Sequence, residues 1–329
     1  MSLPEITHCP GTLAPGHTTY SSTCLRRLFN GRLVSHILPY HSPATGITNE
    51  VSFAGNQQNM SISGVQEKFS VILEGNKLRL ANEGEHGTYI LKPIPSVAQK
   101  TDQMPANEHL TMQIARQIYN IETAENAMIF FEDGSPAYIT KRFDVTQEGP
   151  KLAMEDLAAL TGRTQQTHGA NYKYQGNYLE MFEALKKHLP AYRVEAVKLF
   201  KIILLNYLFS NGDAHFKNFS ILETPMGDYR FSPAYDLVNS RIHVEDQTFA
   251  LSEGLLTASL ALGNVVQQFR TLTEKAEIPA KIVDKEFERF LRHSDKVKIL
   301  TEASFLNNKT KRSYLQAYQT RLGKLKRSM

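Results

Sequence analysis

Hydrophobic and polar residues alternate differently in the two halves of the chain. Between Lys68 and Lys141 the apolar runs are short and are separated by turn residues, a pattern that predicts β-strands. One helix is expected after Pro105, where apolar residues recur at four-residue spacing. The predicted strands form a hairpin over residues 69–80 and continue at 88–92, 127–131 and 137–140. Strands on both sides of one helix predict a small sheet with a packed helix.

Beyond Asp144 the apolar residues recur at helical spacing. Helices are expected over 181–189 and 194–208, and near 22–33 in the otherwise turn-rich N-terminal segment. The polar residues 146–150 favour a boundary between a β-rich lobe and an α-rich lobe. The prediction is an α+β, two-lobed chain, with a β-rich N-lobe over residues 1–142 and a helical C-lobe over 143–329.

Composition places the chain among globular proteins, because hydrophobic residues make up 41% and charged residues 21%. The longest apolar stretch, from Ile202 to Phe209, is interrupted by Asn206 and is too short to cross a bilayer. We therefore expect a cytoplasmic protein without a membrane span. Its two cysteines, Cys9 and Cys24, are expected to be reduced thiols.

The net charge of +4 comes from the C-terminal end, which is basic from Asn307 onward and contains no acidic residue. A basic end of this kind fits an acidic partner, nucleic acid or a phosphorylated group. The alternative is the solvated face of a final helix, whose apolar stripe would be Tyr314, Leu315, Tyr318, Leu322 and Leu325.

Polar and ionisable residues follow directly after the long apolar helix, at 211–218. Asp213 is followed five residues later by Asn218. A carboxylate that deprotonates a hydroxyl and an amide that holds Mg²⁺ are what phosphoryl transfer requires. His215 and Lys217, which lie between them, are placed to steady phosphate oxygens. The run alone equally fits a polar loop with an Asp turn and a capping Asn.

A second set of residues strengthens the phosphotransfer interpretation. Asp236 follows Asn218 by 18 residues, across a short hairpin, where a second magnesium carboxylate is expected. Lys92 ends an apolar strand, where a buried charge is costly unless paired. Glu108, at the start of the next helix, is its expected partner. Such a pair also occurs as a purely structural ion pair.

Two segments of the N-lobe complete the candidate nucleotide site. Residues 61–68 are not a Walker motif, but hydroxyl side chains around Gly64 before a hairpin fit a flap over phosphates. Ser63, Gly64 and Val65 are therefore expected to lie against ATP. Residues 140–144 lie at the lobe junction, where main-chain groups could meet adenine.

Taken in order, these segments resemble the HipA family of kinases. The resemblance covers about residues 61–240 and is carried by 61–68, 89–93, Asn107-Glu108, 141–144, Glu155-Asp156, 211–218 and Tyr235-Asp236. HipA-like proteins are bacterial toxins with a two-lobed, protein-kinase-like fold. They phosphorylate aminoacyl-tRNA synthetases.

The resemblance implies a role for each matching residue. Asp213 is expected as the catalytic base, Asn218 and Asp236 as Mg²⁺ ligands, and Lys92 as a contact of the ATP phosphates. His215 would lie beside them, and main-chain groups of Lys141 and Phe143 would read the adenine, although the family often has Glu in place of Lys141. Ser61 falls on the autophosphorylated serine of the family's loop. Ser63 adds a second candidate for autophosphorylation.

The segment before this loop is shorter than is usual in the family. The chain therefore resembles the short HipT type, in which the missing subdomain is a separate protein, HipS, made beside the DNA-binding protein HipB. The expected partners are an aminoacyl-tRNA synthetase as substrate and small antitoxins of the HipS and HipB type. Contact with DNA is expected only indirectly, through such a partner.

Two alternatives stay open from the sequence. A run of Asp, His and Asn like that at Asp213 also resembles lipid kinases and some small-molecule kinases, although residues 61–68 argue against this. The chain could also be a catalytically inactive regulatory binding protein that acts through its basic end. The presence of Asp213, Asn218, Asp236 and Lys92 argues against inactivity, because phosphoryl transfer needs each of these groups.

Overall fold

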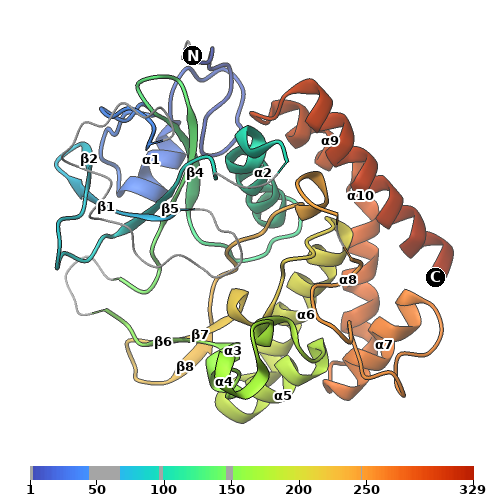
Figure 1. Cartoon of the computed structure of the whole chain (residues 1–329). Helices are drawn as coiled ribbons and strands as arrows, with labels where there is room; N and C mark the ends of the chain where they lie inside the picture. The colour runs from blue at the N-terminus through green and yellow to red at the C-terminus, as the bar shows by residue number, and fades with distance from the viewer. Residues whose placement is uncertain (1–2, 44–66, 96–98, 146–150, 246) are drawn as a thin grey trace.

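The computed structural model describes residues 3–43, 67–95, 99–145, 151–245 and 247–329, and it is a mixed α+β fold (Figure 1). Its strands are β1 (Phe69–Glu74), β2 (Lys77–Leu80), β3 (Tyr89–Lys92), β4 (Asn126–Phe130), β5 (Pro136–Lys141), β6 (Met154–Asp156), β7 (Ser220–Glu223) and β8 (Tyr229–Phe231). Its α-helices are α1 (Ser22–Phe29), α2 (Met104–Gln117), α3 (Leu157–Leu160), α4 (Gln165–His168), α5 (Tyr178–His188), α6 (Tyr192–Leu208), α7 (Val265–Lys275), α8 (Ala280–Arg292), α9 (Ser294–Ala303) and α10 (Asn308–Ser328).

The N-terminal half is built on a five-stranded antiparallel sheet with the order β2-β1-β3-β5-β4. The tight turn between β1 and β2 uses Gly75 at a positive φ of 59°, which costs glycine little. One face of the sheet packs on α1 and the N-terminal loops, and buries Leu28, Phe29 and both cysteines, which are free thiols as predicted. The other face carries α2 (Figure 1).

Helix α2 is buried on almost every side because it lies between the sheet and the C-terminal helices. Pro105 is in its first turn, where a missing N–H costs nothing, and Leu110, Met112 and Ile114 are fully buried. The helix contacts β4 and β5 on one side and α9 on the other. It therefore joins the sheet to the helical half of the molecule.

The C-terminal half packs around α6, whose residues from Leu199 to Leu208 are almost all buried. Helices α5 and α10 flank α6, and a second antiparallel sheet, β6-β7-β8, lies below it (Figure 1). Helix α10 buries Tyr314, Tyr318, Leu322 and Leu325 of the stripe expected for the final helix, while Leu315 is half-buried.

The two halves meet where the backbone of Ala234 pairs with the strand-like segment before β4. The Ala124 N–H donates to the carbonyl of Ala234, and the Ala234 N–H donates to the carbonyl of Glu122. The link predicted at 146–150 lies outside the described residues, so the division at residue 142 stays a prediction. Within the described parts of the chain, no helix is both long enough and apolar enough to cross a membrane.

Candidate functional site

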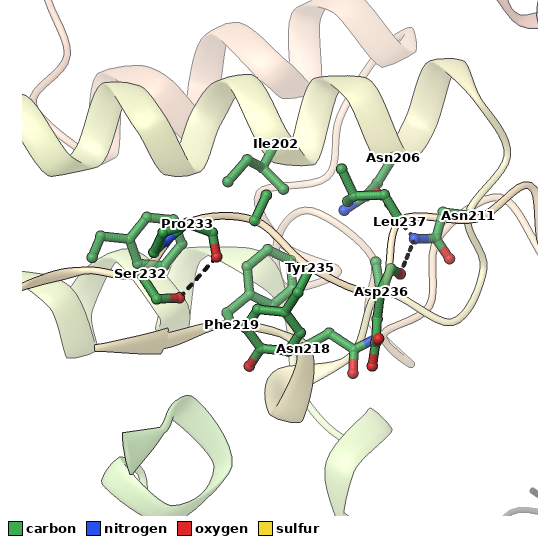
Figure 2. Close-up of a pocket in the computed structure, with 13 residues that line it drawn as sticks. Ile202, Asn206, Asn211, Asn218, Phe219, Ser232, Pro233, Tyr235, Asp236 and Leu237 are labelled. Carbon is green, nitrogen blue, oxygen red and sulfur yellow. Dashed lines mark hydrogen bonds between the residues drawn. The ribbon is translucent and has the colours of Figure 1, made fainter. Parts of the chain in front are cut away.

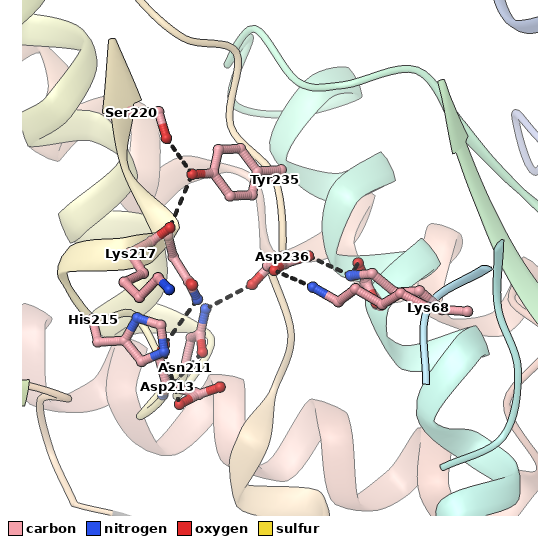
Figure 3. Close-up of polar contacts among 11 residues, drawn as sticks. Lys68, Asn211, Asp213, His215, Lys217, Ser220, Tyr235 and Asp236 are labelled. Carbon is pink, nitrogen blue, oxygen red and sulfur yellow. Dashed lines mark hydrogen bonds and ion pairs between the residues drawn. The ribbon is translucent and has the colours of Figure 1, made fainter. Parts of the chain in front are cut away.

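Lys92, at the end of β3, is the centre of a buried cluster of charges. Its ammonium group lies 2.7 Å from Oε1 of Glu108 on α2 and also binds Oδ1 of Asp236, which follows β8. Lys68, directly before β1, lies 3.5 Å from Oδ2 of the same aspartate (Figure 3). The side chains of Lys92 and Glu108 are 4% and 5% exposed, so solvent screens their pair little. The cluster balances two ammonium groups against two carboxylates.

The cluster shifts the pKa of each buried member. Burial would raise the pKa of Asp236, but the ammonium groups of Lys68 and Lys92 hold it below its usual range. Burial would lower the pKa of Lys92, but the carboxylates of Asp236 and Glu108 raise it. The pKa of Glu108 is raised by its burial, against the opposing effect of Lys92. Lys92 and Asp236 therefore carry their charges at neutral pH.

The loop after α6 is fixed by side chains that bind its backbone. Asn211 accepts a hydrogen bond from the Asp213 N–H at 3.2 Å and donates to Oδ1 of Asn206 at 3.0 Å. Ser240 accepts from the Gly212 N–H at 2.7 Å. Short polar residues bind local backbone groups in this way at turns. These hydrogen bonds fix the backbone that leads into Asp213.

The carboxylate of Asp213 is about half exposed and has two close neighbours. Tyr174, in the short 3₁₀ segment Tyr172–Tyr174, donates its hydroxyl to Oδ1 of Asp213 at 2.6 Å. Nε2 of His215 lies 3.7 Å from the same oxygen (Figure 3). Burial lowers the pKa of His215 to about 4, although Asp213 opposes this shift. His215 is thus a neutral imidazole at pH 7 and adds no positive charge.

Asn218 and Asp236 line one small pocket beneath the loop (Figure 2). The amide nitrogen of Asn218 donates to the carbonyl of Asp213 at 2.9 Å, which leaves the amide oxygen for another partner. An amide oxygen and a carboxylate are oxygen donors of the kind that Mg²⁺ prefers. Asn218 and Asp236 are therefore the residues that would hold a magnesium ion in this pocket.

The remaining residues expected at the site lie in different surroundings. The Lys141 N–H donates to the carbonyl of Glu125 at 2.8 Å, so it already has a backbone acceptor, and the ammonium group of Lys141 binds Asn30 at 2.7 Å. The ring of Phe143 packs on that of Tyr235 at 5.8 Å, directly before Asp236. The side chain of Lys217 is exposed beside the loop.

The serines of the flap expected over the phosphates are not among the described residues. Ser61, Ser63, Gly64 and Val65 lie outside the described residues. The described chain resumes at Glu67, and Lys68 directly after it contacts Asp236. The chain that follows the flap therefore leads into the charge cluster.

The structure adds residues that the sequence interpretation did not assign to the site. Lys68 ends the motif over residues 61–68 without an assigned role, and Tyr174 belongs to no motif. Lys173 is a further addition, because its ammonium group interacts electrostatically with Asp213, Lys217 and Lys68, and burial lowers its pKa. Tyr174 precedes Asp213 by 39 residues in a segment without periodic pattern, so no local signal could have found it.

Comparisons with known proteins identify relatives of this chain. The sequence model of the HipA-like C-terminal domain matches residues 60–298. A candidate kinase of Haemophilus influenzae is 28% identical over 189 residues, which cover 56% of this chain and 53% of that protein. The candidate kinase Y4dM of Sinorhizobium fredii is 30% identical over 244 residues, which cover 69% of this chain and 56% of that protein. The matched region thus spans about half the length of these relatives.

Two solved structures share the fold. A chain in the Shewanella oneidensis MR-1 complex of HipA, HipB and operator DNA superposes with a TM-score of 0.63 at 19% identity, covering 85% of this chain and 67% of that one. The proinflammatory kinase CtkA of Helicobacter pylori gives a TM-score of 0.50 at 14% identity, covering 79% of this chain and 90% of that one. The fold class predicted from the sequence is confirmed.

Proposed function

Because the chain belongs to the HipA-like C-terminal domain family, we propose that it is an ATP-dependent protein serine/threonine kinase that uses Mg²⁺. One observation carries this proposal most directly. Lys92 binds both Glu108 and Asp236, and the loop of Asp213 and Asn218 lies beside Asp236. A strand lysine paired with a helix glutamate, next to a base and two oxygen donors for a metal, is the set of groups that phosphoryl transfer from ATP requires.

Asp213 is proposed as the base that receives the proton of the acceptor hydroxyl. The hydroxyl oxygen then bonds to the γ-phosphorus of ATP, the bond between that phosphorus and the bridging oxygen breaks, and ADP leaves. The half-exposed carboxylate of Asp213 is accessible to such a hydroxyl. A magnesium ion held by Asn218 and Asp236 would neutralise phosphate charge.

The lysines around the aspartates are suited to a triphosphate. Lys92 and Lys68 each bind one carboxylate oxygen of Asp236. Phosphate oxygens offer these ammonium groups alternative partners, and Asp236 then becomes available to a cation. Lys173 and Lys217 add positive charge close to Asp213. We expect His215 to act as a neutral hydrogen-bonding group, because burial lowers its pKa to about 4.

The biological role is proposed from the family. We infer that the chain is the toxin of a toxin–antitoxin system of the short HipT type, that it phosphorylates an aminoacyl-tRNA synthetase, and that small antitoxins of the HipS and HipB type regulate it. The structural relative from Shewanella oneidensis is part of a complex with HipB and operator DNA, which supports antitoxin partners for this chain.

Ser61 and Ser63 are proposed as sites of autophosphorylation. Phosphate on either serine would add roughly −1.5 to −2 charge units at neutral pH. Residues 61–66 directly precede the described segment that contains Lys68. A phosphate here competes with ATP for the same lysines, so it should switch the kinase off.

A transfer assay tests the proposal. The purified protein is incubated with Mg²⁺ and γ-labelled ATP, with and without bacterial extract, beside the Asp213→Asn variant. We expect phosphoserine or phosphothreonine on this chain, and on a band of synthetase size, in the wild type only. Label on lipid or on a small molecule would redirect the proposal to another class of kinase. Absence of transfer from bound ATP to any acceptor would overturn it in favour of a regulatory binding protein.

A further inference from the structure

Building on the proposed kinase function, we propose that the Tyr174 hydroxyl occupies the place on Asp213 that the acceptor hydroxyl takes during transfer. Its oxygen lies 2.6 Å from Oδ1 of Asp213. A general base and the hydroxyl that it deprotonates must approach to about 2.6–3.2 Å. Tyr174 thus makes the contact that an acceptor serine or threonine needs. An acceptor reaches the base by displacing the phenol.

The position of Tyr174 is built into the fold. Its carbonyl accepts the Ser252 N–H at 2.8 Å, and its ring packs edge-on against His215 with centroids 4.9 Å apart. The following Gln175 carbonyl accepts from Nε of Arg163 at 3.2 Å. The guanidinium of Arg163 lies 3.9 Å from the ring centroid of Phe216, in the same loop as Asp213. Arg163 therefore holds the tyrosine segment against the catalytic loop.

The phenol fits the role of an occupant that is displaced rather than deprotonated. The Tyr174 hydroxyl is the donor of this hydrogen bond and the carboxylate is its acceptor, so the phenol keeps its proton. Hydrogen bonds to a charged group are stronger than neutral ones, so the contact favours the arrangement in which Tyr174 occupies Asp213. A protein acceptor brings further contacts that offset the loss, whereas a water molecule brings none. Tyr174 would thereby select protein acceptors over water.

Two conservative substitutions separate the role of the Tyr174 hydroxyl from that of its ring. The ring of Tyr174 keeps its packing on His215 when only the oxygen is removed, so Tyr174→Phe changes the hydrogen bond and little else. Tyr172 is on the same 3₁₀ segment and is half-buried against the core. Tyr172→Phe therefore removes a hydroxyl from the same segment without touching Asp213, and it serves as the matched control.

The test measures ADP release from Mg²⁺-ATP with no other protein present and with Ser61 and Ser63 both replaced by Ala in every form, so that neither proposed autophosphorylation site competes with water as the acceptor. We expect Tyr174→Phe to release ADP about tenfold faster than the wild type, since a charge-assisted hydrogen bond corresponds to about that factor or more. Tyr172→Phe should match the wild type, and the KM for ATP should be the same in all three. Tyr174→Leu, which also lacks the hydroxyl, should behave as Tyr174→Phe does.

Each other outcome has a defined meaning. Equal ADP release from the wild type and Tyr174→Phe overturns the role of Tyr174, including the case in which both bind ATP and neither releases ADP. If the wild type nevertheless labels a protein serine, the proposed kinase function survives that result. If no form transfers phosphate to any acceptor, the kinase function itself fails. Phosphate found on Tyr174 by mass spectrometry would show that the phenol is an acceptor, which also contradicts the inference.

Discussion

Lys92 illustrates how a single buried charge organises the site. Taking an ammonium group out of water is unfavourable unless close partners compensate for it. The side chain is 4% exposed, and the carboxylates of Glu108 and Asp236 both contact it. Breaking such a buried pair by removing one partner typically costs about 3–5 kcal/mol. The partly buried contact of Lys68 with Asp236 is worth less, about 0–1 kcal/mol, because solvent reaches and screens it.

His215 gives a prediction for pH dependence. Burial lowers its pKa to about 4 in the folded state, below the ordinary value near 6.5. The unfolded chain therefore binds an additional proton between these values, so the contribution of His215 to stability is full above pH 6.5 and is lost as the pH falls towards 4. The loss amounts to about 3 kcal/mol. Urea unfolding at several pH values between 7 and 4.5 measures it.

The matched variant is His215→Gln, which cannot take up the proton. Its free energy of unfolding should fall less steeply with decreasing pH, because the variant takes up as much as one proton fewer on unfolding. His109 keeps part of the slope in both proteins, because its burial also lowers its pKa to about 4. An unchanged slope in the variant would show that His215 does not titrate in this window.

Residues that belong to a local motif could be predicted from the sequence, and residues that join it from afar could not. Asp213 and Asn218 share one loop, and Lys92 stands out because an apolar strand rarely ends in a charge. The contact of Lys68 with Asp236 spans 168 residues of sequence. Tyr174 is one aromatic residue in a segment of irregular polar composition. Only the folded chain brings Lys68 to Asp236 and Tyr174 to Asp213.

At the scale of elements, helix α2 positions the segment that follows Asp236. Asn107 donates to the carbonyl of Asn239 at 2.9 Å and accepts from its N–H at 3.1 Å, so one amide satisfies both backbone groups. It also bonds to the ring of His243 at 2.8 Å. Both asparagines are fully buried. Helix α2 therefore carries Glu108 and, one residue earlier, the side chain that holds the aspartate segment.

Asn107→Ala should loosen this attachment. It removes the two buried hydrogen bonds to the N–H and C=O of Asn239 and the one to His243, which should cost about 2–3 kcal/mol in the free energy of unfolding. Phosphate transfer should fall as well, because Asp236 lies three residues before Asn239. Chemical denaturation and the transfer assay measure the two effects. Gln117→Ala, an amide truncation at an exposed position of the same helix, should change stability by less than about 0.5 kcal/mol, and an equal loss in both variants would contradict the prediction.

The elements that the sequence predicts are present, including short strands such as β2 and β3, whereas β6 is not part of that prediction. The helix expected over 194–208 is α6, which begins at Tyr192, and the hairpin over 69–80 is β1 with β2. The helix expected near 22–33 ends earlier, because Asn30 adopts a left-handed conformation that closes α1. Strand β6 has three residues and exists by pairing with β7, so its own sequence shows no period. Tertiary contacts determine such elements.

At the scale of the whole molecule, the site is assembled from both halves of the chain. Lys92 comes from β3, Lys68 directly precedes β1, Glu108 comes from α2, and Asp236 comes from the segment after β8. The ion pairs of Lys92 and Lys68 with Asp236 thus connect the sheet to the helical half. A nucleotide that binds these lysines should act on the stability of the whole chain.

Mg²⁺-ADP should therefore raise the thermal unfolding midpoint of the wild type by several degrees, because a ligand at about 100 times its Kd adds about 2.7 kcal/mol to stability. Asp236→Asn should lose the part of this shift that depends on Mg²⁺, since the amide is a weaker cation ligand than the carboxylate. Asp213→Asn should keep the full shift, because Asp213 is proposed to accept a proton and not to hold the metal. Differential scanning fluorimetry with Mg²⁺-ADP, and with ADP and a chelator, separates the two contributions. Equal Mg²⁺-dependent shifts in the wild type and Asp236→Asn would remove Asp236 from the proposed metal site.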